Sequence, residues 1–369
     1  MKKTILFLLD REVTYLPPLM AILDSLNEDY SLKVISYEKP GGIEHLQKQY
    51  DGKDVSFLST ITTPQHTLRE RIKRRICNYL NIKNAFYKEA VFLMEKTPYD
   101  LLWVIHEETV HEFKDLLLGK KYIVSLYELN DYRRDFLEQI KPALQSAAEV
   151  FIPEYNRACI LRVWLQLTTT PTVIPNKPST HPRRRCIDNA YSEQLKEKKI
   201  ILYQGYIQRS RNLDKICEAC SDLADYKVVL LGKGNASYIE ELKRNYPKIL
   251  HIPFVNPPEH LYITSYAHLA VVKYDMLSLN MIFCAPNKTW EYTGFGIPVL
   301  GNEIPGLEYT IGQGKAGICT NLDNVDCIKK AINTIDNHYE EYSKNATLYY
   351  ESYDVEIKLK EIVKRHFNE

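Results

Sequence analysis

Short runs rich in Val, Ile and Leu alternate along the chain with longer stretches whose apolar residues recur at helical spacing. Such runs, separated by helices, predict parallel strands covered by helices on both faces of a sheet. The predicted strands form two groups, covering residues 4–9, 32–36, 55–58, 101–105, 122–126, 149–152 and 172–174, and then 199–204, 227–231, 250–252, 269–272, 298–300 and 317–319. The expected fold class is therefore α/β, with two doubly wound domains.

The two groups of strands are separated by a segment without periodicity. It contains Pro175, Pro178 and Pro182, and a run of arginines follows it. Such a segment is typical of a linker. We therefore expect a first domain over residues 1–175, a linker over 176–198 and a second domain over 199–349. Residues 350–369 read as one amphipathic helix at the end of the chain.

Composition limits the classes of function. The chain has 369 residues, which suits two domains, and its 48 basic and 47 acidic residues leave a net charge of +1, so we expect no nucleic-acid partner. The short apolar run near the N-terminus is followed by charged residues and reads as a buried strand, and no run is long enough to span a bilayer. The eight cysteines are scattered, which is typical of reduced cytoplasmic thiols and predicts no metal site.

Residues 286–311 carry the most specific chemistry. Asn287, Lys288 and Thr289 open a helix, whose free N–H groups and positive dipole end favour phosphate. Glu291 lies about one turn further on, where a carboxylate can accept hydrogen bonds from a ribose diol. Together these positions predict a site for a nucleoside diphosphate.

This segment reads Pro-Asn-Lys, two further residues, Glu-Tyr, a glycine-rich turn and a Pro-Val strand. It resembles the donor-site motif of GT-B glycosyltransferases, in particular the family-4-like branch (glycosyl transferases group 1). The resemblance implies two Rossmann-like domains facing a cleft, with the acceptor on the first and the nucleotide sugar on the second. It also implies a C-terminal helix that crosses back to the first domain.

The same resemblance assigns further donor residues. Gly205 ends a predicted strand, and Arg209 and Arg211 precede the next helix. The family places a basic residue here that holds the donor diphosphate, and guanidinium groups suit phosphate oxygens. Arg211 matches that position better than Arg209, and a solvated basic turn is the alternative for both. The family often has a second basic residue directly after the glycine, where this chain has Tyr206.

Three more positions complete the expected donor site. Gly232 begins a Gly-x-Gly loop after a strand, where glycine would let the backbone approach a ligand, although an ordinary turn explains it equally well. Phe254 and Val255 match the segment whose backbone meets the nucleobase in the family. Backbone recognition leaves little residue signature, so UDP and GDP both stay open as donors.

One departure concerns the reaction centre. Many retaining members carry a glutamate eight residues before the second one, and this chain has Phe283 there. Asp275 is a weak acidic substitute, because an aspartate at a strand end often only caps a turn. The resemblance implies a retaining reaction in which Arg211 and the helix start stabilise the leaving diphosphate. No Asp-x-Asp motif is present, so we expect neither a metal nor a cofactor beside the sugar donor.

The first domain offers a second catalytic candidate. His106 directly follows the strand 101–105, and the matching histidine of the family faces the donor sugar. Histidine can bind a sugar hydroxyl or share a proton near neutral pH, whereas a helix-start histidine without a ligand is the alternative. Asp10 and Tyr15 lie in the loop after the first strand, and Glu128 follows the strand 122–126. We assign these three to the acceptor side.

A basic segment suggests a membrane surface. Arg71, Lys73, Arg74 and Arg75 lie close together beside apolar residues. A basic amphipathic helix of this kind suits an anionic lipid surface, and a solvated basic helix packed on the sheet is the alternative. The first reading predicts a cytoplasmic protein that lies peripherally on the inner face of the membrane.

The function expected from these observations is transfer of a sugar from a nucleotide-diphosphate sugar to a glycan or lipid-linked acceptor, in surface polysaccharide or glycoconjugate synthesis. Two alternatives stay open. A GT-B nucleotide-sugar 2-epimerase would keep the donor site and use water in place of an acceptor. A transferase-like subunit without turnover would bind a nucleotide or a partner only.

Overall fold

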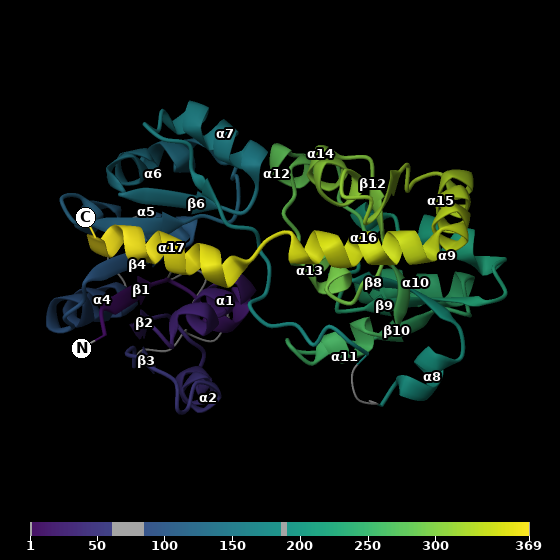
Figure 1. Cartoon of the computed structure of the whole chain (residues 1–369), viewed down its shortest axis with the longest axis horizontal. Helices are drawn as coiled ribbons and strands as arrows, with labels where there is room; N and C mark the ends of the chain where they lie inside the picture. The colour runs from purple at the N-terminus through teal and green to yellow at the C-terminus, as the bar shows by residue number, and fades with distance from the viewer. Residues whose placement is uncertain (1, 61–84, 186–189, 369) are drawn as a thin grey trace. The chain divides into compact units, whose positions relative to one another are not determined.

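The computed structural model describes residues 2–60, 85–185 and 190–368. The chain divides into two compact units (Figure 1). Unit 1 consists of Met1–Ser179 together with Val355–Glu369, and unit 2 is Thr180–Asp354. Each unit contains its own parallel sheet, so the expected α/β class with two doubly wound domains is confirmed.

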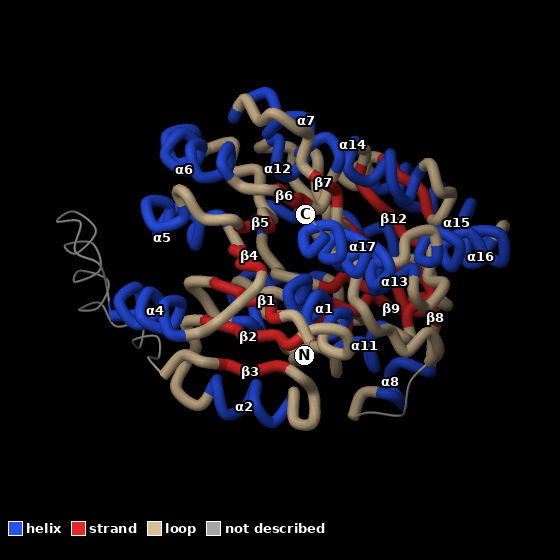
Figure 2. Tube along the Cα trace, turned by 60° about the vertical axis from the view of Figure 1, so that its left-hand side comes forward, coloured by secondary structure: helices blue, strands red, loops and turns tan. Residues whose placement is uncertain are grey.

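The sheet of unit 1 is parallel throughout and follows the order β3-β2-β1-β4-β5-β6-β7. Figure 2 shows the strands in this sequence from bottom to top. The order reverses between β1 and β4, and doubly wound sheets bind ligands beyond the carboxyl ends of strands at such a switch point. The strands are β1 (Thr4–Leu8), β2 (Ser31–Ile35), β3 (Val55–Phe57), β4 (Leu101–Ile105), β5 (Tyr122–Ser125), β6 (Glu149–Ile152) and β7 (Thr172–Val173).

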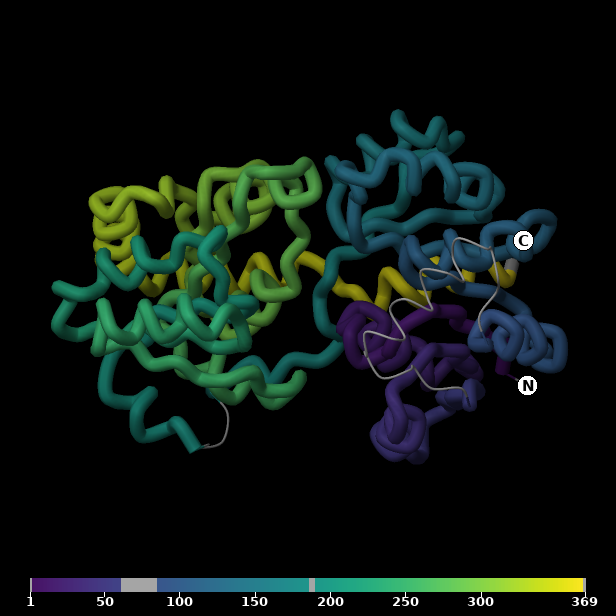
Figure 3. The backbone as a smooth tube through the Cα atoms, turned by 180° about the vertical axis from the view of Figure 1, so that it is seen from behind, coloured from purple at the N-terminus to yellow at the C-terminus, as the bar shows by residue number. Residues whose placement is uncertain are grey.

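The C-terminal helix belongs to unit 1. It packs beside α1, and Lys121 Nζ donates a hydrogen bond to the carbonyl of His366 at 3.2 Å. Figure 3 follows the yellow end of the chain from unit 2 back to unit 1. The helices of unit 1 are α1 (Pro17–Leu26), α2 (Gly42–Gln49), α4 (Ala85–Lys96), α5 (Glu107–Leu117), α6 (Arg134–Ser146), α7 (Tyr155–Leu165) and α17 (Val355–Asn368), with a 3-10 turn at Val13–Tyr15.

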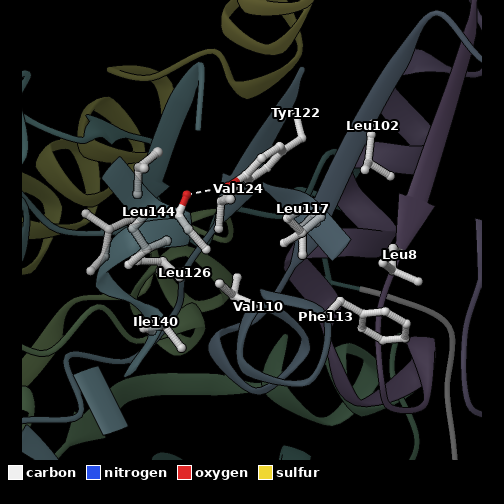
Figure 4. Packing of buried hydrophobic residues seen from close by; sticks show 14 of the residues in the cluster. Leu8, Leu102, Val110, Phe113, Leu117, Tyr122, Val124, Leu126, Ile140 and Leu144 are labelled. Atoms are coloured by element: carbon white, nitrogen blue, oxygen red, sulfur yellow. Dashed lines mark hydrogen bonds between the residues drawn. The ribbon is translucent and has the colours of Figure 1, made fainter. Parts of the chain in front are cut away.

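The core of unit 1 forms between α5 and the sheet. Val110, Phe113 and Leu117 recur at helical spacing along α5, and all three are fully buried. They pack in one cluster with strand residues such as Leu102 and Val124 (Figure 4). Burying a side chain of this size contributes about 1.5–3 kcal/mol. This packing fixes the sheet edge at which β4 ends and α5 begins.

The sheet of unit 2 is also parallel, in the order β10-β9-β8-β11-β12-β13, and its switch point lies between β8 and β11. Its strands are β8 (Lys199–Gln204), β9 (Tyr226–Leu231), β10 (Leu250–Ile252), β11 (Ala267–Val272), β12 (Val299–Asn302) and β13 (Gly317–Thr320). Its helices are α8 (Ser192–Lys196), α9 (Asp214–Ser221), α10 (Ala236–Asn245), α11 (His260–Thr264), α12 (Leu279–Ile282), α13 (Asn287–Thr293), α14 (Pro305–Leu307), α15 (Val325–Asn337) and α16 (Tyr339–Glu351), with a 3-10 turn at Arg209–Arg211 and a π-turn at Glu308–Gly312.

Each predicted strand is present, with ends that shift by no more than two residues. Two expectations need correction. The segment 350–369 is not one helix, because α16 ends at Glu351 and α17 begins at Val355. The segment 176–198 contains α8, and its residue His181 packs edge-on against the ring of Phe295.

Within the ranges that the structure covers, no helix has the length and apolar character needed to cross a bilayer. No group of three or more His, Cys, Asp or Glu side chains there is arranged to hold a metal ion. Cys217 and Cys220 lie buried in α9, and burial raises the pKa of both thiols.

Candidate functional site

Lys288 lies at the switch point of the second sheet. Gly205 directly follows β8 with φ +142°, and a Cβ added there would lie 2.9 Å from Lys288 Nζ. Glycine therefore lets the ammonium group of α13 approach the end of β8. Tyr274, which comes two residues after β11, has its ring centre 6.0 Å from the same nitrogen. The two strands that flank the switch point thus both lie close to this cation.

The ammonium group of Lys288 has no hydrogen-bond or ion-pair partner among the described residues. Burial lowers its pKa, the nearby charge of Arg211 lowers it further, and Glu291 acts in the opposite direction. A cation in such surroundings is stabilised by any anion that reaches it. Lys288 can therefore interact favourably with a negatively charged ligand.

Arg211 is the second cation at this switch point. Its Nη1 donates to the carbonyl of Lys273 at 2.9 Å, and its guanidinium lies 4.6 Å from the centre of the Tyr274 ring. No carboxylate among the described residues pairs with it. Lys273 itself is occupied, since its Nζ contacts Asp323. Arg211 and Lys288 thus contact one aromatic ring, and neither forms a direct ion pair with a carboxylate of the described residues, although the charge of Glu291 acts on Lys288.

Arg209 lies outside this arrangement. It forms a two-point ion pair with Glu241 on α10, and its side chain is 61% exposed. Of the two arginines predicted to hold a diphosphate, the structure places only Arg211 near Lys288. An exposed ion pair of this kind contributes little to stability.

Glu291 is held by a network of side chains from two elements, β8 and α11. Gln204 Nε2, at the end of β8, donates to Glu291 Oε2 at 2.7 Å. His260 Nε2, on α11, lies 3.3 Å from the same oxygen. Thr264 donates its hydroxyl to Gln204 Oε1 at 2.8 Å, which fixes the amide orientation. Burial acts to raise the pKa of Glu291, but His260, Gln204 and Lys288 more than offset it, so this pKa lies below its usual range.

His260 and His181 are functional candidates that the sequence did not reveal. His181 accepts a hydrogen bond from the Arg183 N–H on Nδ1 at 3.0 Å, so its Nε2–H donates to the Glu291 carbonyl at 2.9 Å. Burial lowers the pKa of His181 to about 4, which keeps the ring neutral. His260 is also buried, and its Nδ1 has no hydrogen-bond partner in the described part of the chain. Both histidine rings thus contact Glu291 of α13, although neither residue lies near this helix in the sequence.

The start of α13 is less open than expected. The hydroxyl of Thr289 donates to the Pro286 carbonyl at 2.8 Å and is buried, so it does not face a ligand. Asn287 is half-buried and begins the helix. No side chain caps the helix start, although a helix of seven residues has only a weak dipole. The cationic side chains therefore carry more of the anion-binding character than the helix end does.

Gly232 has a structural role. A Cβ at this position would lie 2.2 Å from the Gly205 carbonyl oxygen, so the loops after β8 and β9 need glycine to pack together. Phe254 and Val255 follow β10, and Phe254 is 53% exposed with Lys233 Nζ 5.2 Å from its ring centre. The Phe254 ring is therefore accessible for stacking. Gly232, in contrast, allows two loops to pack closely and has no side chain to offer a ligand.

Phe283 and Asp275 lie in the loop region after β11. Phe283 is the C-terminal cap residue of α12, where its N–H donates to the Leu279 carbonyl at 2.9 Å. Asp275 is half-buried, and its Oδ1 has no hydrogen-bond partner among the described residues. A carboxylate oxygen in that position can accept a hydrogen bond from a ligand hydroxyl.

In unit 1, His106 lies at the switch point between β1 and β4. Its Nε2 is 2.8 Å from Arg11 Nη1, and its Nδ1 is 3.2 Å from Glu107 Oε2. Burial lowers the pKa of His106 to about 4, and the charge of Arg11 lowers it further. Glu107 is fully buried and accepts from the N–H groups of Tyr127 and Glu128, both at 2.6 Å. Arg11 was not among the predicted site residues.

The three predicted acceptor residues differ in their surroundings. Asp10 accepts a hydrogen bond from the Thr109 hydroxyl at 3.0 Å and lies beside Arg11. Tyr15 is exposed and contacts Lys39. Glu128 lies 3.7 Å from Arg157, which donates to the Tyr127 carbonyl. The predicted membrane residues Arg71, Lys73, Arg74 and Arg75 lie outside the described residues.

Comparison with known proteins gives the fold. No protein-family model matches the chain, and no curated protein matches it in sequence. The chain is similar to HepE of Anabaena in complex with UDP and glucose, with 12% identity over 98% of both chains and a TM-score of 0.70. Sucrose-phosphate synthase of Thermosynechococcus elongatus gives 14% identity over 100% of both chains and a TM-score of 0.67.

A Listeria monocytogenes protein assigned as a UDP-N-acetylglucosamine 2-epimerase is similar at the same level. It shows 14% identity and a TM-score of 0.66, over 100% of this chain and 97% of that one. Proteins with different assigned activities thus share one architecture with this chain. The two parallel sheets, the returning C-terminal helix and these likenesses together show that the chain has the GT-B glycosyltransferase fold.

Proposed function

We propose that this protein is a glycosyltransferase that takes a sugar from a nucleotide-diphosphate sugar. The observation that supports it best is the pair of cations at the switch point of the second sheet. Neither Lys288 nor Arg211 forms a direct ion pair with a carboxylate in the described part of the chain, and both contact the ring of Tyr274. Two like charges in a partly buried site destabilise each other until an anion joins them. A diphosphate supplies that anion, and HepE, which has the same fold, has been solved with UDP and with UDP-glucose.

Each residue would have a distinct role in the reaction. Arg211 and Lys288 would stabilise the negative charge that grows on the leaving diphosphate. Glu291, with its orientation fixed by Gln204 and His260, would accept hydrogen bonds from the ribose diol through its less occupied oxygen. The Phe254 ring would stack on the base. We propose that the sugar is transferred with retention, to a glycan or lipid-linked acceptor, and that turnover needs no metal.

Turnover in variants of the cation pair tests this function. Purified protein is incubated with UDP-glucose, UDP-N-acetylglucosamine and GDP-mannose, with and without EDTA, and release of the nucleoside diphosphate is measured. Lys288→Met should slow release by about a hundredfold or more, the range for losing one such group. The matched control is Lys243→Met, because Lys243 is an exposed lysine of the same unit that pairs with Glu240. Equal rates in both variants would remove Lys288 from the reaction.

Product analysis separates the transferase from the epimerase. The epimerase is the second candidate because a protein assigned as a UDP-N-acetylglucosamine 2-epimerase has the same fold, with a TM-score of 0.66. A 2-epimerase that uses water in place of an acceptor would convert UDP-N-acetylglucosamine and water into UDP and the 2-epimer of the free sugar. A transferase couples release to the formation of a glycoside. Free epimerised sugar as the main product would overturn the transferase proposal.

We also propose that the protein lies peripherally on the inner face of the membrane. The support is the charge pattern of Arg71, Lys73, Arg74 and Arg75 alone, at about 1 kcal/mol for each basic residue near an anionic surface. Sedimentation with phosphatidylglycerol vesicles at low salt tests it. Replacement of the four residues by glutamine should release the protein, and a wild type that never sediments would contradict the proposal.

A further inference from the structure

Arg11 and His106 meet at the place where the first sheet would bind a ligand. Arg11 lies in the loop after β1, His106 directly follows β4, and the strand order reverses between these two strands. Doubly wound sheets bind ligands beyond the carboxyl ends of their strands at this position. Both side chains therefore lie where a ligand of unit 1 is expected.

Both ring nitrogens of His106 are already in use. An arginine N–H can only donate, so Nε2 of His106 must be the acceptor of the 2.8 Å bond from Arg11. The ring proton then lies on Nδ1, which is enclosed by Glu107, with Oε2 at 3.2 Å but without hydrogen-bond geometry. The Glu108 N–H lies 3.3 Å from Nδ1 and would require Nδ1 to be the acceptor. The Arg11 bond is shorter and comes from a charged donor, so it decides which nitrogen carries the proton. His106 thus has no free nitrogen for a sugar hydroxyl.

The backbone of His106 shows that its side chain is required at this position. Its φ of 80° and ψ of 147° lie in a region that residues other than glycine rarely adopt. Such a conformation is strained and persists only where the surroundings enforce it. The His106 N–H donates to the Ser125 carbonyl at 2.8 Å, and Val110 donates back to the His106 carbonyl at 3.2 Å. Glycine would avoid the strain, but it could not hold Arg11.

Asp10 and Arg11 are in contact, and each keeps one polar side-chain atom without a partner among the described residues. Arg11 Nε lies 3.3 Å from Asp10 Oδ1, which also accepts from the Thr109 hydroxyl at 3.0 Å. Asp10 Oδ2 and Arg11 Nη2 have no partner among the described residues, and the Arg11 side chain is 32% exposed. A hydroxyl group both donates and accepts, so two neighbouring hydroxyls match this pair. The balanced charge of the pair favours a neutral sugar over an anion.

We propose that Asp10 and Arg11 together bind two neighbouring hydroxyls of a sugar at the switch point of the first sheet, and that His106 is a positioning residue for Arg11. The inference rests on the proposed function, in which this sugar is part of the acceptor. It reverses the role that the family resemblance gives to His106, since the histidine holds the binding group instead of touching the sugar.

Neutral His106 is consistent with this role. Burial and Arg11 lower its pKa, while the carboxylates of Asp10, Glu108 and Glu128 act weakly in the opposite direction. A ring that stays neutral near pH 7 keeps Nε2 as an acceptor for Arg11. A long-range proton–nitrogen NMR spectrum of His106 should place the proton on Nδ1 from pH 5 to pH 8. A proton on Nε2 would overturn the assignment.

Binding of methyl glycosides tests the site directly. The methyl α-glycosides of glucose, galactose and mannose are titrated into the whole protein and followed by saturation-transfer NMR. At least one should bind the wild type, and Arg11→Ala should weaken it by about tenfold or more, as expected for a hydrogen bond to a charged group. The matched control is Arg162→Ala, because Arg162 is an exposed arginine of the same unit that bonds Thr170. No binding to wild type, or equal binding to Arg11→Ala, would overturn the proposal.

Two substitutions separate positioning from direct contact. Asn at position 106 tolerates a positive φ better than most residues, and its amide oxygen can accept from Arg11. His106→Asn should therefore bind the glycoside within about threefold of wild type, whereas His106→Ala should match Arg11→Ala. If Asn fails as fully as Ala while UDP binding persists, the ring itself contacts the sugar and the inference is wrong. If the wild type does not bind UDP, the proposed function is contradicted. The proposal for Asp10 and Arg11 is tested separately, because the glycoside titration contains no UDP.

Discussion

Removing His260 should loosen the helix that carries the donor-site residues. His260 and Glu291 are both largely buried, with side chains 9% and 14% exposed, and their facing atoms are 3.3 Å apart. A hydrogen bond to a charged group contributes about 1.5–3 kcal/mol. Because the contact is long, we expect a loss at the lower end, about 1.5–2 kcal/mol. Such a loss raises the local opening constant by roughly ten- to thirtyfold.

Hydrogen exchange of the amides in residues 291–297 measures this opening directly. His260→Ala should exchange faster by that factor at pH 7, while the amides of β8 keep their protection. The control is His338→Ala, an exposed histidine of the same unit. His260→Gln retains a donor and should recover most of the protection. If His260→Ala exchanges like the control, Glu291 does not depend on His260 and the network has no stabilising role.

Three further predictions follow from the geometry. Arg211→Ala should lower kcat by at least about tenfold, whereas Arg209→Ala should change it by less than about twofold because its ion pair is exposed; equal effects in steady-state assays would contradict the assignment. His181 has a folded pKa of about 4, below its ordinary 6.5, so only the unfolded state takes up its proton between these values and stability falls as the pH drops through this window. Urea titrations at pH 7 and pH 5 should show this loss in wild type and a smaller one in His181→Asn; identical losses would refute it. Gly232→Ala should lower the melting temperature far more than Gly119→Ala, because both have positive φ and only Gly232 would place a Cβ 2.2 Å from another backbone atom; similar melting temperatures would show that the loops can shift.

The strands and the fold class could be read from the sequence because burial on both faces of a parallel sheet produces continuous apolar runs. Short elements without such a run were harder to predict. The five-residue helix α8 lies in a stretch that the prolines made look like a plain linker. The break between α16 and α17 was also missed, since both flanking segments have helical periodicity.

The site was predictable where the chemistry is local and unpredictable where distant residues decide it. The Asn-Lys helix start and Glu291 lie within one short segment, so their spacing revealed them. The choice between Arg209 and Arg211 depends on Glu241, which is 32 residues from Arg209 in sequence. His181 reaches the Glu291 carbonyl across 110 residues, and no local pattern marks such a contact.

The most direct test of the donor site compares a nucleotide with its nucleoside. Titration calorimetry gives the affinities of UDP and uridine, and of GDP and guanosine, for wild type and for the double variant Lys288→Met, Arg211→Ala. In the proposed function the two cations would contact the diphosphate only, so wild type should prefer one nucleotide over its nucleoside by about a hundredfold or more. In the double variant this preference should fall to about tenfold or less, while nucleoside affinity is unchanged. A preference that survives the loss of both cations would contradict a diphosphate site at this switch point.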